Sequence, residues 1–277
     1  MIIRAIAACM IVIAQAGAVM ADRAADLDEL ARLMQFAETV EIIRIEGQNY
    51  GETLIEDMMP GIGAKSWNKT IADIYDPVSM LALVRQGFDA DLSQTDLAPL
   101  LGYFRSDAGR EVVRLEISAR RAFVDADVEA VARQRLEALA AEQADILQQV
   151  QTLIDDSDLI NLNVAGTLNS SLMFFTGFYE GLGPEAGDGA TEAQMLSDVW
   201  AQEEATRADA ETWLNSFMVM AYQPLPPEQL EAYAAFFRSD EGRDLNRAIF
   251  AGFDLMFEEL SYKLGLTVAS YMSSEPL

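Results

Sequence analysis

The chain has 277 residues, of which 45 are acidic and 19 basic, so its formal net charge is −26 at pH 7. A surface this acidic repels nucleic acid and anionic lipid, and we expect neither as a partner. Hydrophobic residues make up 51% of the chain, which excludes a disordered polar chain and favours a folded globular protein.

The first segment, residues 1–21, has the pattern of a secretory signal peptide. Arg4 gives a short positive start, an apolar run covers residues 6–14, and Val19 and Ala21 are small residues that suit signal peptidase. We expect cleavage after Ala21 and a periplasmic or secreted location in a Gram-negative bacterium. A retained anchor is the alternative, but the run is shorter than the roughly 20 residues that cross a bilayer. No later segment is both long and uncharged enough to do so.

Two chemistry-bearing residue types are scarce in this chain. Cys9 is the only cysteine and belongs to the signal peptide, and the chain has no histidine. Triads of the Ser-His-Asp or Cys-His type and thiolate metal sites are therefore impossible after cleavage. No glycine-rich phosphate-binding pattern occurs in the sequence. We expect no catalytic residues, no cofactor and no metal site, and hence a protein that is not an enzyme.

Helical spacing of apolar residues continues from Leu27 to the end of the chain and predicts an all-α fold. The predicted helices cover 27–37, 39–59, 65–75, 77–88, 93–105, 107–155 with a bend or break near 125–127, 158–182, 191–222, 227–238 and 240–271. Pro60–Gly63 and Gly181–Gly189 predict breaks between helices. No run of alternating β-branched residues predicts a strand.

One heptapeptide occurs twice, as FRSDAGR at 104–110 and FRSDEGR at 237–243. Between 97–115 and 230–248, eight of the 19 positions are identical without a gap. Such a register predicts duplication of one ancestral unit. We expect two tandem repeats of a small helical unit that pack as one bundle-like body. The signal peptide would be followed by a first unit at 22–156 and a second at 157–277.

Each copy of the motif predicts a tight corner between two helices. Ser106 is placed to cap the second helix, and Asp107 lies in its first turn, where a negative charge meets the positive helix end. Gly109 indicates that another backbone or an aromatic ring lies close to it. Arg110 and Arg114 share one face and can reach acids or exposed carbonyls. The candidate corner residues are Phe104, Arg105, Ser106, Asp107, Gly109, Arg110 and Arg114 in the first copy and Phe237, Arg238, Ser239, Asp240, Gly242, Arg243 and Arg247 in the second.

The arginines of this motif have a functional alternative. Arg105, Arg110 and Arg114, with their counterparts in the second copy, could form an anion-binding edge at a helix start. Positive charge is scarce in this chain, so a local arginine cluster is notable. The neighbouring Asp107 argues against a free anion site, and the structural role as a helix corner is favoured.

The aromatic pair followed by Arg-Ser-Asp-x-Gly-Arg resembles the motif of the exported bacterial proteins grouped as domain-of-unknown-function family 2059. In that family the motif commonly reads Phe-Tyr-x-Ser-Pro-x-Gly, and here Asp107 and Asp240 stand at the proline position. The resemblance covers residues 85–125 and 218–258. It implies a small helical exported domain and brings no catalytic residues to carry over.

The functional prediction is a non-enzymatic interaction protein of the cell envelope, or an accessory factor there, that binds another protein or a peptide. Its expected binding surface is the groove between the two repeats. One alternative is a carboxylate-based hydrolase of envelope glycans, which needs two acids at a suitable separation. The other is weak binding of divalent cations by acidic clusters. The oligomeric state stays open.

Overall fold

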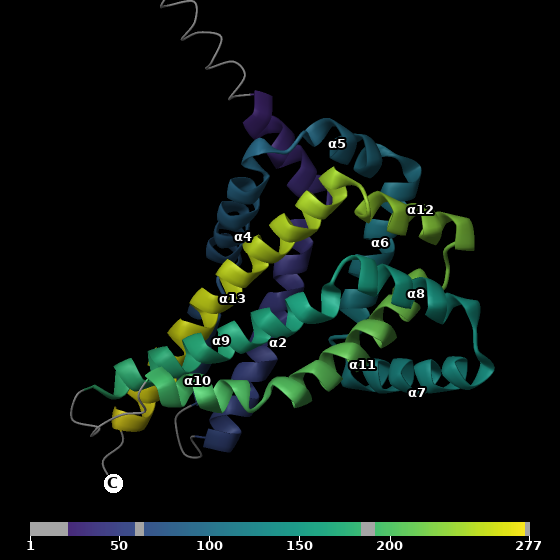
Figure 1. Ribbon diagram of the computed structural model, residues 1–277. Coiled ribbons are helices and arrows are strands. Elements are labelled where there is room, and N and C mark those ends of the chain that lie inside the picture. Colours follow the sequence, from purple (N-terminus) through teal and green to yellow (C-terminus); the bar gives the residue numbers. More distant parts are fainter. Residues whose placement is uncertain (1–21, 59–63, 184–191, 275–277) are drawn as a thin grey trace, which may run out of the picture.

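The computed structural model describes residues 22–58, 64–183 and 192–274, and all regular secondary structure in these ranges is helical (Figure 1). The all-α prediction is therefore confirmed for this part of the chain. The predicted signal peptide, the predicted break at 60–63 and residues 184–189 of the break predicted at 181–189 lie outside the described residues.

The helices are long and closely spaced along the chain. A first helix covers residues 22–33. The next are α2 (Phe36–Met58), α3 (Ala64–Ile74), α4 (Pro77–Asp91), the 3-10 turn η1 (Leu92–Gln94), α5 (Leu97–Arg105), α6 (Asp107–Ala122), α7 (Ala126–Glu142) and α8 (Asp145–Asp156). The remaining helices are α9 (Leu159–Leu182), α10 (Glu192–Trp200), α11 (Glu203–Tyr222), α12 (Pro227–Phe237) and α13 (Asp240–Ser274).

Most helix starts follow the sequence signals, and two breaks do not. Asp76 caps α4 by accepting a hydrogen bond from the Ser79 backbone N–H at 2.8 Å, and Pro227 occupies the first turn of α12. Of the bend or break expected near 125–127, the structure shows a break between α6 and α7. A second break at Gln143, whose φ is 54°, divides the segment predicted as one helix to residue 155. The predicted helix 191–222 is likewise two helices, α10 and α11.

The longest helix, α13, packs mainly against α9 and also against α4 (Figure 1). Glycines allow these close approaches. A Cβ atom added to Gly177 of α9 would lie 2.1 Å from the Tyr262 carbonyl oxygen, and one added to Gly265 of α13 would lie 2.0 Å from that of Phe174. Gly252 of α13 meets the backbone of α4 in the same way. Backbone contact at these points fixes the position of α13.

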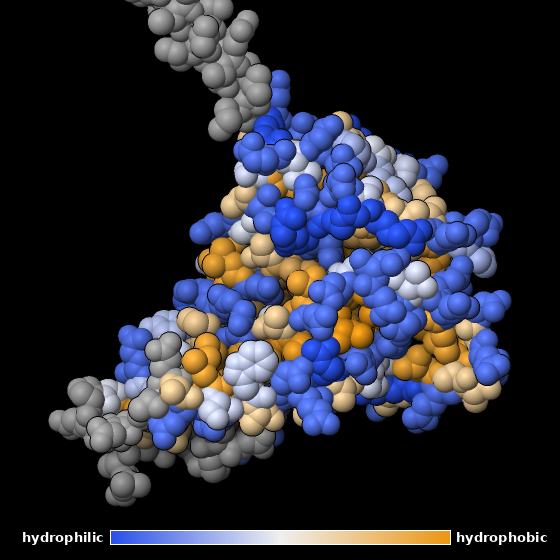
Figure 2. Space-filling view, viewed as in Figure 1, coloured by the Kyte–Doolittle hydropathy of each residue, from blue (hydrophilic) through white to orange (hydrophobic). Residues whose placement is uncertain are grey.

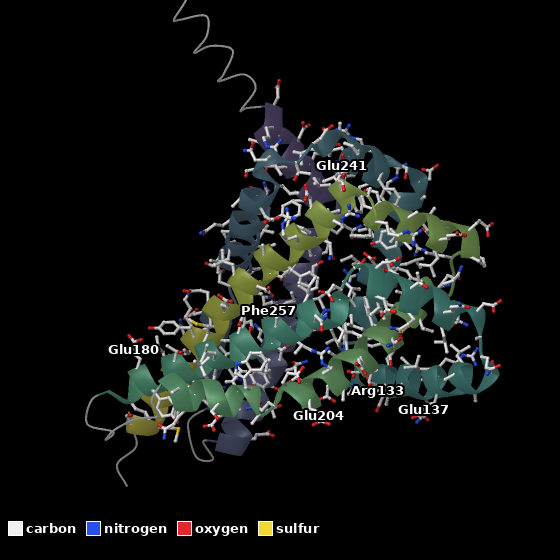
Figure 3. The ribbon with its side chains drawn as sticks, viewed as in Figure 1. Arg133, Glu137, Glu180, Glu204, Glu241 and Phe257 are labelled. Carbon is white, nitrogen blue, oxygen red and sulfur yellow. The ribbon has the colours of Figure 1, made fainter. Side chains whose placement is uncertain are left out.

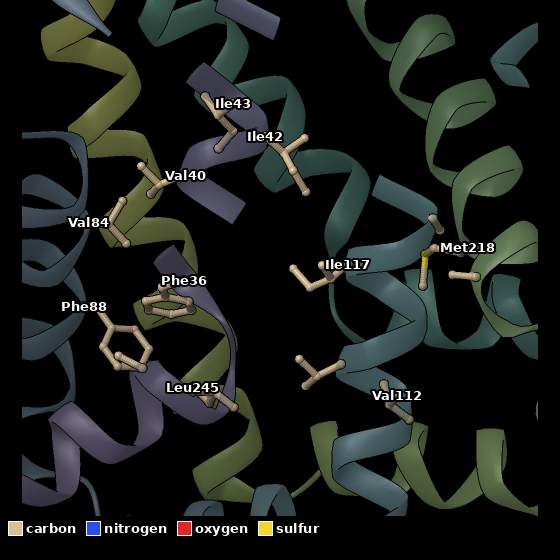
Figure 4. Close-up of a cluster of buried hydrophobic side chains, with 14 of the residues drawn as sticks. Phe36, Val40, Ile42, Ile43, Val84, Phe88, Val112, Ile117, Met218 and Leu245 are labelled. Atoms are coloured by element: carbon tan, nitrogen blue, oxygen red, sulfur yellow. The ribbon is translucent and has the colours of Figure 1, made fainter. Parts of the chain in front are cut away.

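Helices from the two halves of the chain pack against one another. From the N-terminal half, α4 packs against α13 and α6 packs against α11. One hydrophobic core includes buried residues from both halves. Figure 4 shows Phe36, Phe88 and Leu245 in this core, contributed by α2, α4 and α13. The two halves therefore form a single packed body.

The helices were expected to include no membrane-spanning segment after residue 21. Within residues 22–58, 64–183 and 192–274, no helix combines the length and the apolar character that crossing a membrane requires.

Candidate functional site

The repeated heptapeptide forms two helix corners with the same hydrogen bonds. At the first corner, between α5 and α6, the Ser106 hydroxyl accepts from the Gly109 backbone N–H at 3.1 Å and donates to the Tyr103 carbonyl at 2.6 Å. At the second, between α12 and α13, Ser239 accepts from Gly242 at 3.0 Å and donates to the Phe236 carbonyl at 2.6 Å. Each serine is the N-cap that the sequence indicates.

The corner glycines lie against the backbone of the preceding helix. A Cβ atom at Gly109 would lie 2.3 Å from the Tyr103 carbonyl oxygen, and one at Gly242 would lie 2.1 Å from the Phe236 carbonyl oxygen. No real Cβ atom approaches a backbone oxygen so closely. Glycine is therefore required at both corners by the close backbone approach expected from the sequence.

The motif arginines are all engaged by protein groups. Arg110 donates to the Arg105 carbonyl and to Asp107, and Arg243 repeats both contacts at the second corner with Arg238 and Asp240. The other ion pairs are Arg105–Glu29, Arg114–Glu111, Arg238–Asp156, Arg247–Asp91 and Arg247–Asp244. The geometry therefore matches the structural role of the motif, and these six arginines offer no free cation to an anion.

The two corners are in contact with each other. Tyr103 stacks on Phe236, and Phe104 and Phe237 flank this pair at roughly right angles. Phe104 and Phe237 are buried in the core. The motif thus joins four helices at one aromatic cluster.

A different region of the molecule has the form of a binding site. A cavity of about 630 Å³ lies among α2, α6, α9, α11 and α13. Its lining is chiefly hydrophobic and aromatic, and includes Phe36, Trp213, Phe217, Phe250, Phe253 and Phe257. Figure 2 shows hydrophobic side chains gathered at the centre of one face, between α9 and α11. Phe257 lies on α13 where that helix runs beside α9 (Figure 3).

The aromatic lining is anchored by ring contacts. Trp213 and Phe217, one turn apart on α11, stack with centroids 5.0 Å apart. Across the cavity, Phe36 of α2 meets Phe253 of α13 edge to face at 5.6 Å. These rings are only partly buried, apart from Phe36. A ligand entering the cavity would therefore meet preformed apolar surface.

Glu116 of α6 is the first of three charged residues in the cavity wall. Its Oε1 atom accepts hydrogen bonds from the hydroxyls of Tyr222 at 2.5 Å and Tyr233 at 2.8 Å. Burial of the carboxyl group raises the pKa of Glu116, and the two tyrosine hydroxyls oppose that rise. The same burial raises the pKa of both tyrosines well above the usual value, so they remain donors.

Arg120, one turn further along α6, is paired within the protein. It forms an ion pair with Glu46 of α2 at 2.6 Å, and its guanidinium lies 5.0 Å from the centre of the Trp213 ring. Burial raises the pKa of Glu46, an effect that Arg120 opposes. A guanidinium over an indole face is a favourable cation–π contact. Arg120 thus holds Trp213 against the cavity wall.

Asp254 of α13 is the third charged residue. Its carboxylate faces α9 at Gly166, where an added Cβ would lie 2.6 Å from the Asp254 Oδ1 atom. Partial burial, and secondarily the negative charge of Glu258, raise the pKa of Asp254 to about 6. Among the described residues, no hydrogen-bond donor or cation is paired with it. Thr167 and Ser170 of α9 also line the cavity.

Within the described ranges, no group of three or more Asp, Glu, His or Cys residues is arranged to hold an ion.

Glu116, Arg120, Trp213 and Asp254 are not among the site residues predicted from the sequence. A signal was present for Asp254, which interrupts the apolar run 249–257 with an acid. A search of family models, of curated proteins and of solved structures gives no match to this chain.

Proposed function

We propose that this protein is a non-enzymatic binding protein that holds an apolar ligand in the cavity among α2, α6, α9, α11 and α13. The observation that carries the proposal is the cavity of about 630 Å³, with its lining of partly exposed aromatic rings. Small-molecule sites typically measure about 300–1,000 Å³ and combine apolar walls with a few polar groups. This cavity has both properties.

The position of the cavity supports a binding surface between the two halves of the chain. Its walls come from α2 and α6 of the N-terminal half and from α9, α11 and α13 of the C-terminal half. An apolar side chain from a partner protein or peptide could occupy the same space. An accessory role in the cell envelope stays our proposal for the biological setting.

Export and duplication complete this proposal. We infer export from the signal-like residues 1–21, with cleavage after Ala21. We infer two tandem repeats from the 133-residue offset between the heptapeptides at 104 and 237. The identical capping hydrogen bonds of Ser106 and Ser239 support descent from one unit.

A neutral fluorescent probe tests the binding function. We expect phenylnaphthylamine to show a saturable rise in emission with the wild-type protein, and energy transfer from Trp213 to the bound probe. Ser170→Trp should weaken probe binding by about tenfold or more, because an indole at this position fills the cavity.

Asn169→Trp is the matched control. Asn169 is the preceding residue of α9, is exposed and does not line the cavity. We expect this variant to bind the probe like the wild type. Equal binding by both variants, or no saturable binding by the wild type, would reject the cavity as a ligand site.

Glycan hydrolysis is a second candidate, favoured by one observation. Glu116 and Asp254 line the same cavity, burial raises the pKa of both carboxyl groups, and glycosidases use a pair of carboxyl groups. It ranks lower because Oε1 of Glu116 is held by two tyrosines and the walls are chiefly apolar. Release of soluble fragments from purified peptidoglycan by the wild type, and none by Glu116→Gln, would establish it.

A further inference from the structure

The charged side chains around the cavity differ in whether the protein supplies a hydrogen-bond or ion-pair partner for them. Arg120 is paired with Glu46 and lies over Trp213. Glu116 accepts two tyrosine hydroxyls on one oxygen. Asp254 has no such partner among the described residues. Within the described ranges, Asp254 is therefore the carboxylate of the cavity that has neither a hydrogen-bond donor nor a cation as its partner.

An uncompensated carboxylate beside apolar surface is costly unless a ligand supplies the opposite charge. Asp254 lies between Gly166 of α9 and the aromatic residues one turn before and after it on α13, Phe250 and Phe257. A larger side chain at position 166 would collide with the carboxylate, so this glycine leaves room for it. The surrounding rings can also face a cation, since the π face of an aromatic ring attracts positive charge.

We propose that the ligand of this cavity is a small amphipathic amine, whose ammonium group pairs with Asp254 and whose apolar body lies against Phe253, Phe257 and Trp213. This inference rests on the proposed binding function. It assigns Asp254 as the residue that determines specificity for the charge of the ligand.

Charge complementarity decides between an amine and a fatty acid. A ligand carboxylate would need a free cation, and the only basic residue in the cavity wall within the described ranges, Arg120, is already paired with Glu46. The chain also carries a formal net charge of −26, which attracts cations and repels anions at long range. A neutral ligand would leave Asp254 without compensation. An amine needs no free cation in the cavity, is attracted by the negative net charge and pairs with Asp254.

Three ligands of equal chain length test the assignment. Octylamine, octanol and octanoate are titrated against the phenylnaphthylamine complex of the full mature chain at neutral pH. We expect octylamine to bind about tenfold more tightly than octanol, which corresponds to one charge-assisted hydrogen bond. Octanoate should bind more weakly than octanol.

Asp254→Asn isolates the charge with little change in shape. We expect this variant to lose the preference for octylamine while its affinity for octanol stays within about twofold of the wild type. Glu241→Gln is the control, because it removes one negative charge at the start of the same helix, away from Phe257 (Figure 3). It should keep the full preference.

Different results would reject the amine assignment and the proposed binding function on which it rests. Equal affinities for octylamine and octanol, tighter binding of octanoate, or an unchanged preference in Asp254→Asn would overturn the amine assignment while leaving the cavity a ligand site. Tighter binding of a short lysine-containing apolar peptide than of octylamine would also overturn it. Absence of binding by the probe and by all three ligands would reject the proposed function itself. The comparison in the wild-type protein stands even if Asp254→Asn folds poorly.

Discussion

Tyr103 and Phe236 stack face to face, with ring centroids 4.2 Å apart and planes inclined by 16°. Each is the residue before the phenylalanine of one heptapeptide, so equivalent positions of the two motif copies touch. Each also supplies the carbonyl that its corner serine binds. One ring contact therefore joins two helix corners that are far apart in the sequence.

This contact should be important for stability. Removing the ring in Phe236→Ala should lower the free energy of unfolding by about 2 kcal/mol, since the side chain is partly buried. The double variant with Tyr103→Ala should cost less than the sum of the two single variants by roughly 0.5–1.5 kcal/mol. Urea denaturation followed by circular dichroism measures both. Tyr50→Ala, at a half-exposed tyrosine, is the control. Strict additivity would show that the two rings do not interact.

Alanine substitutions at Gly109 and Gly102 should change the free energy of unfolding in opposite directions. Gly109→Ala should destabilise the protein by more than about 2 kcal/mol, because the added methyl meets the Tyr103 carbonyl oxygen. Gly102→Ala, inside α5 with no atom within 4 Å of the added Cβ, should stabilise it by up to about 1 kcal/mol. Thermal unfolding of both variants provides the comparison. A neutral result for Gly109→Ala would mean that the corner is looser than described.

The two serine N-caps should contribute equally to the free energy of unfolding. Ser106→Ala and Ser239→Ala each remove one acceptor for a backbone N–H, at a cost of about 1 kcal/mol. Ser93→Ala is a suitable reference, because Ser93 is exposed in η1. Chemical denaturation midpoints measure the three losses. Unequal losses at the two corners would contradict the identity of their geometry.

Asp254 predicts a pH dependence of stability. Its pKa is raised from 3.8 to about 6 by folding, so between these values the folded state binds more protons than the unfolded state. Its contribution therefore favours unfolding at neutral pH, and this penalty is relieved as the pH falls through 6. Asp254→Asn should raise the free energy of unfolding at pH 7.5 by on the order of 1 kcal/mol, after allowance for the exposed part of the carboxyl group.

The measurement is a comparison of the two proteins at pH 5 and pH 7.5. The increase in the free energy of unfolding caused by Asp254→Asn should be smaller at pH 5, because Asp254 of the wild-type protein is mostly protonated there. Glu258 on the same helix and Glu116 and Arg120 across the cavity also bear charge near this group, and both proteins keep them. A gain that is the same at both pH values would argue against titration of Asp254.

The local features of this fold could be predicted from sequence. Ser106 and Gly109 act within one helix corner, so residue type and spacing were sufficient to predict their roles. The break at Gln143 could not be predicted in this way. It contains neither glycine nor proline, and a glutamine rarely adopts a positive φ.

The cavity depends on relationships that no local pattern contains. Its walls are five helices whose residues range from Met34 to Phe257, and their meeting depends on the glycine contacts of α13. Trp213 and Asp254 are ordinary helix residues until those contacts bring them together. The duplicated motif predicted the two helix corners, while the close contacts of α13 bring the walls of the cavity together.

The packing of helices from one half of the chain against helices from the other has a consequence for how the chain folds. The backbone of α4 at Gly87 is complementary to α13 at Ala251 and Gly252, far along the chain. Contacts of such long sequence separation slow folding, because a large loop must close before they form. The core is therefore complete only after α13 has packed against α4.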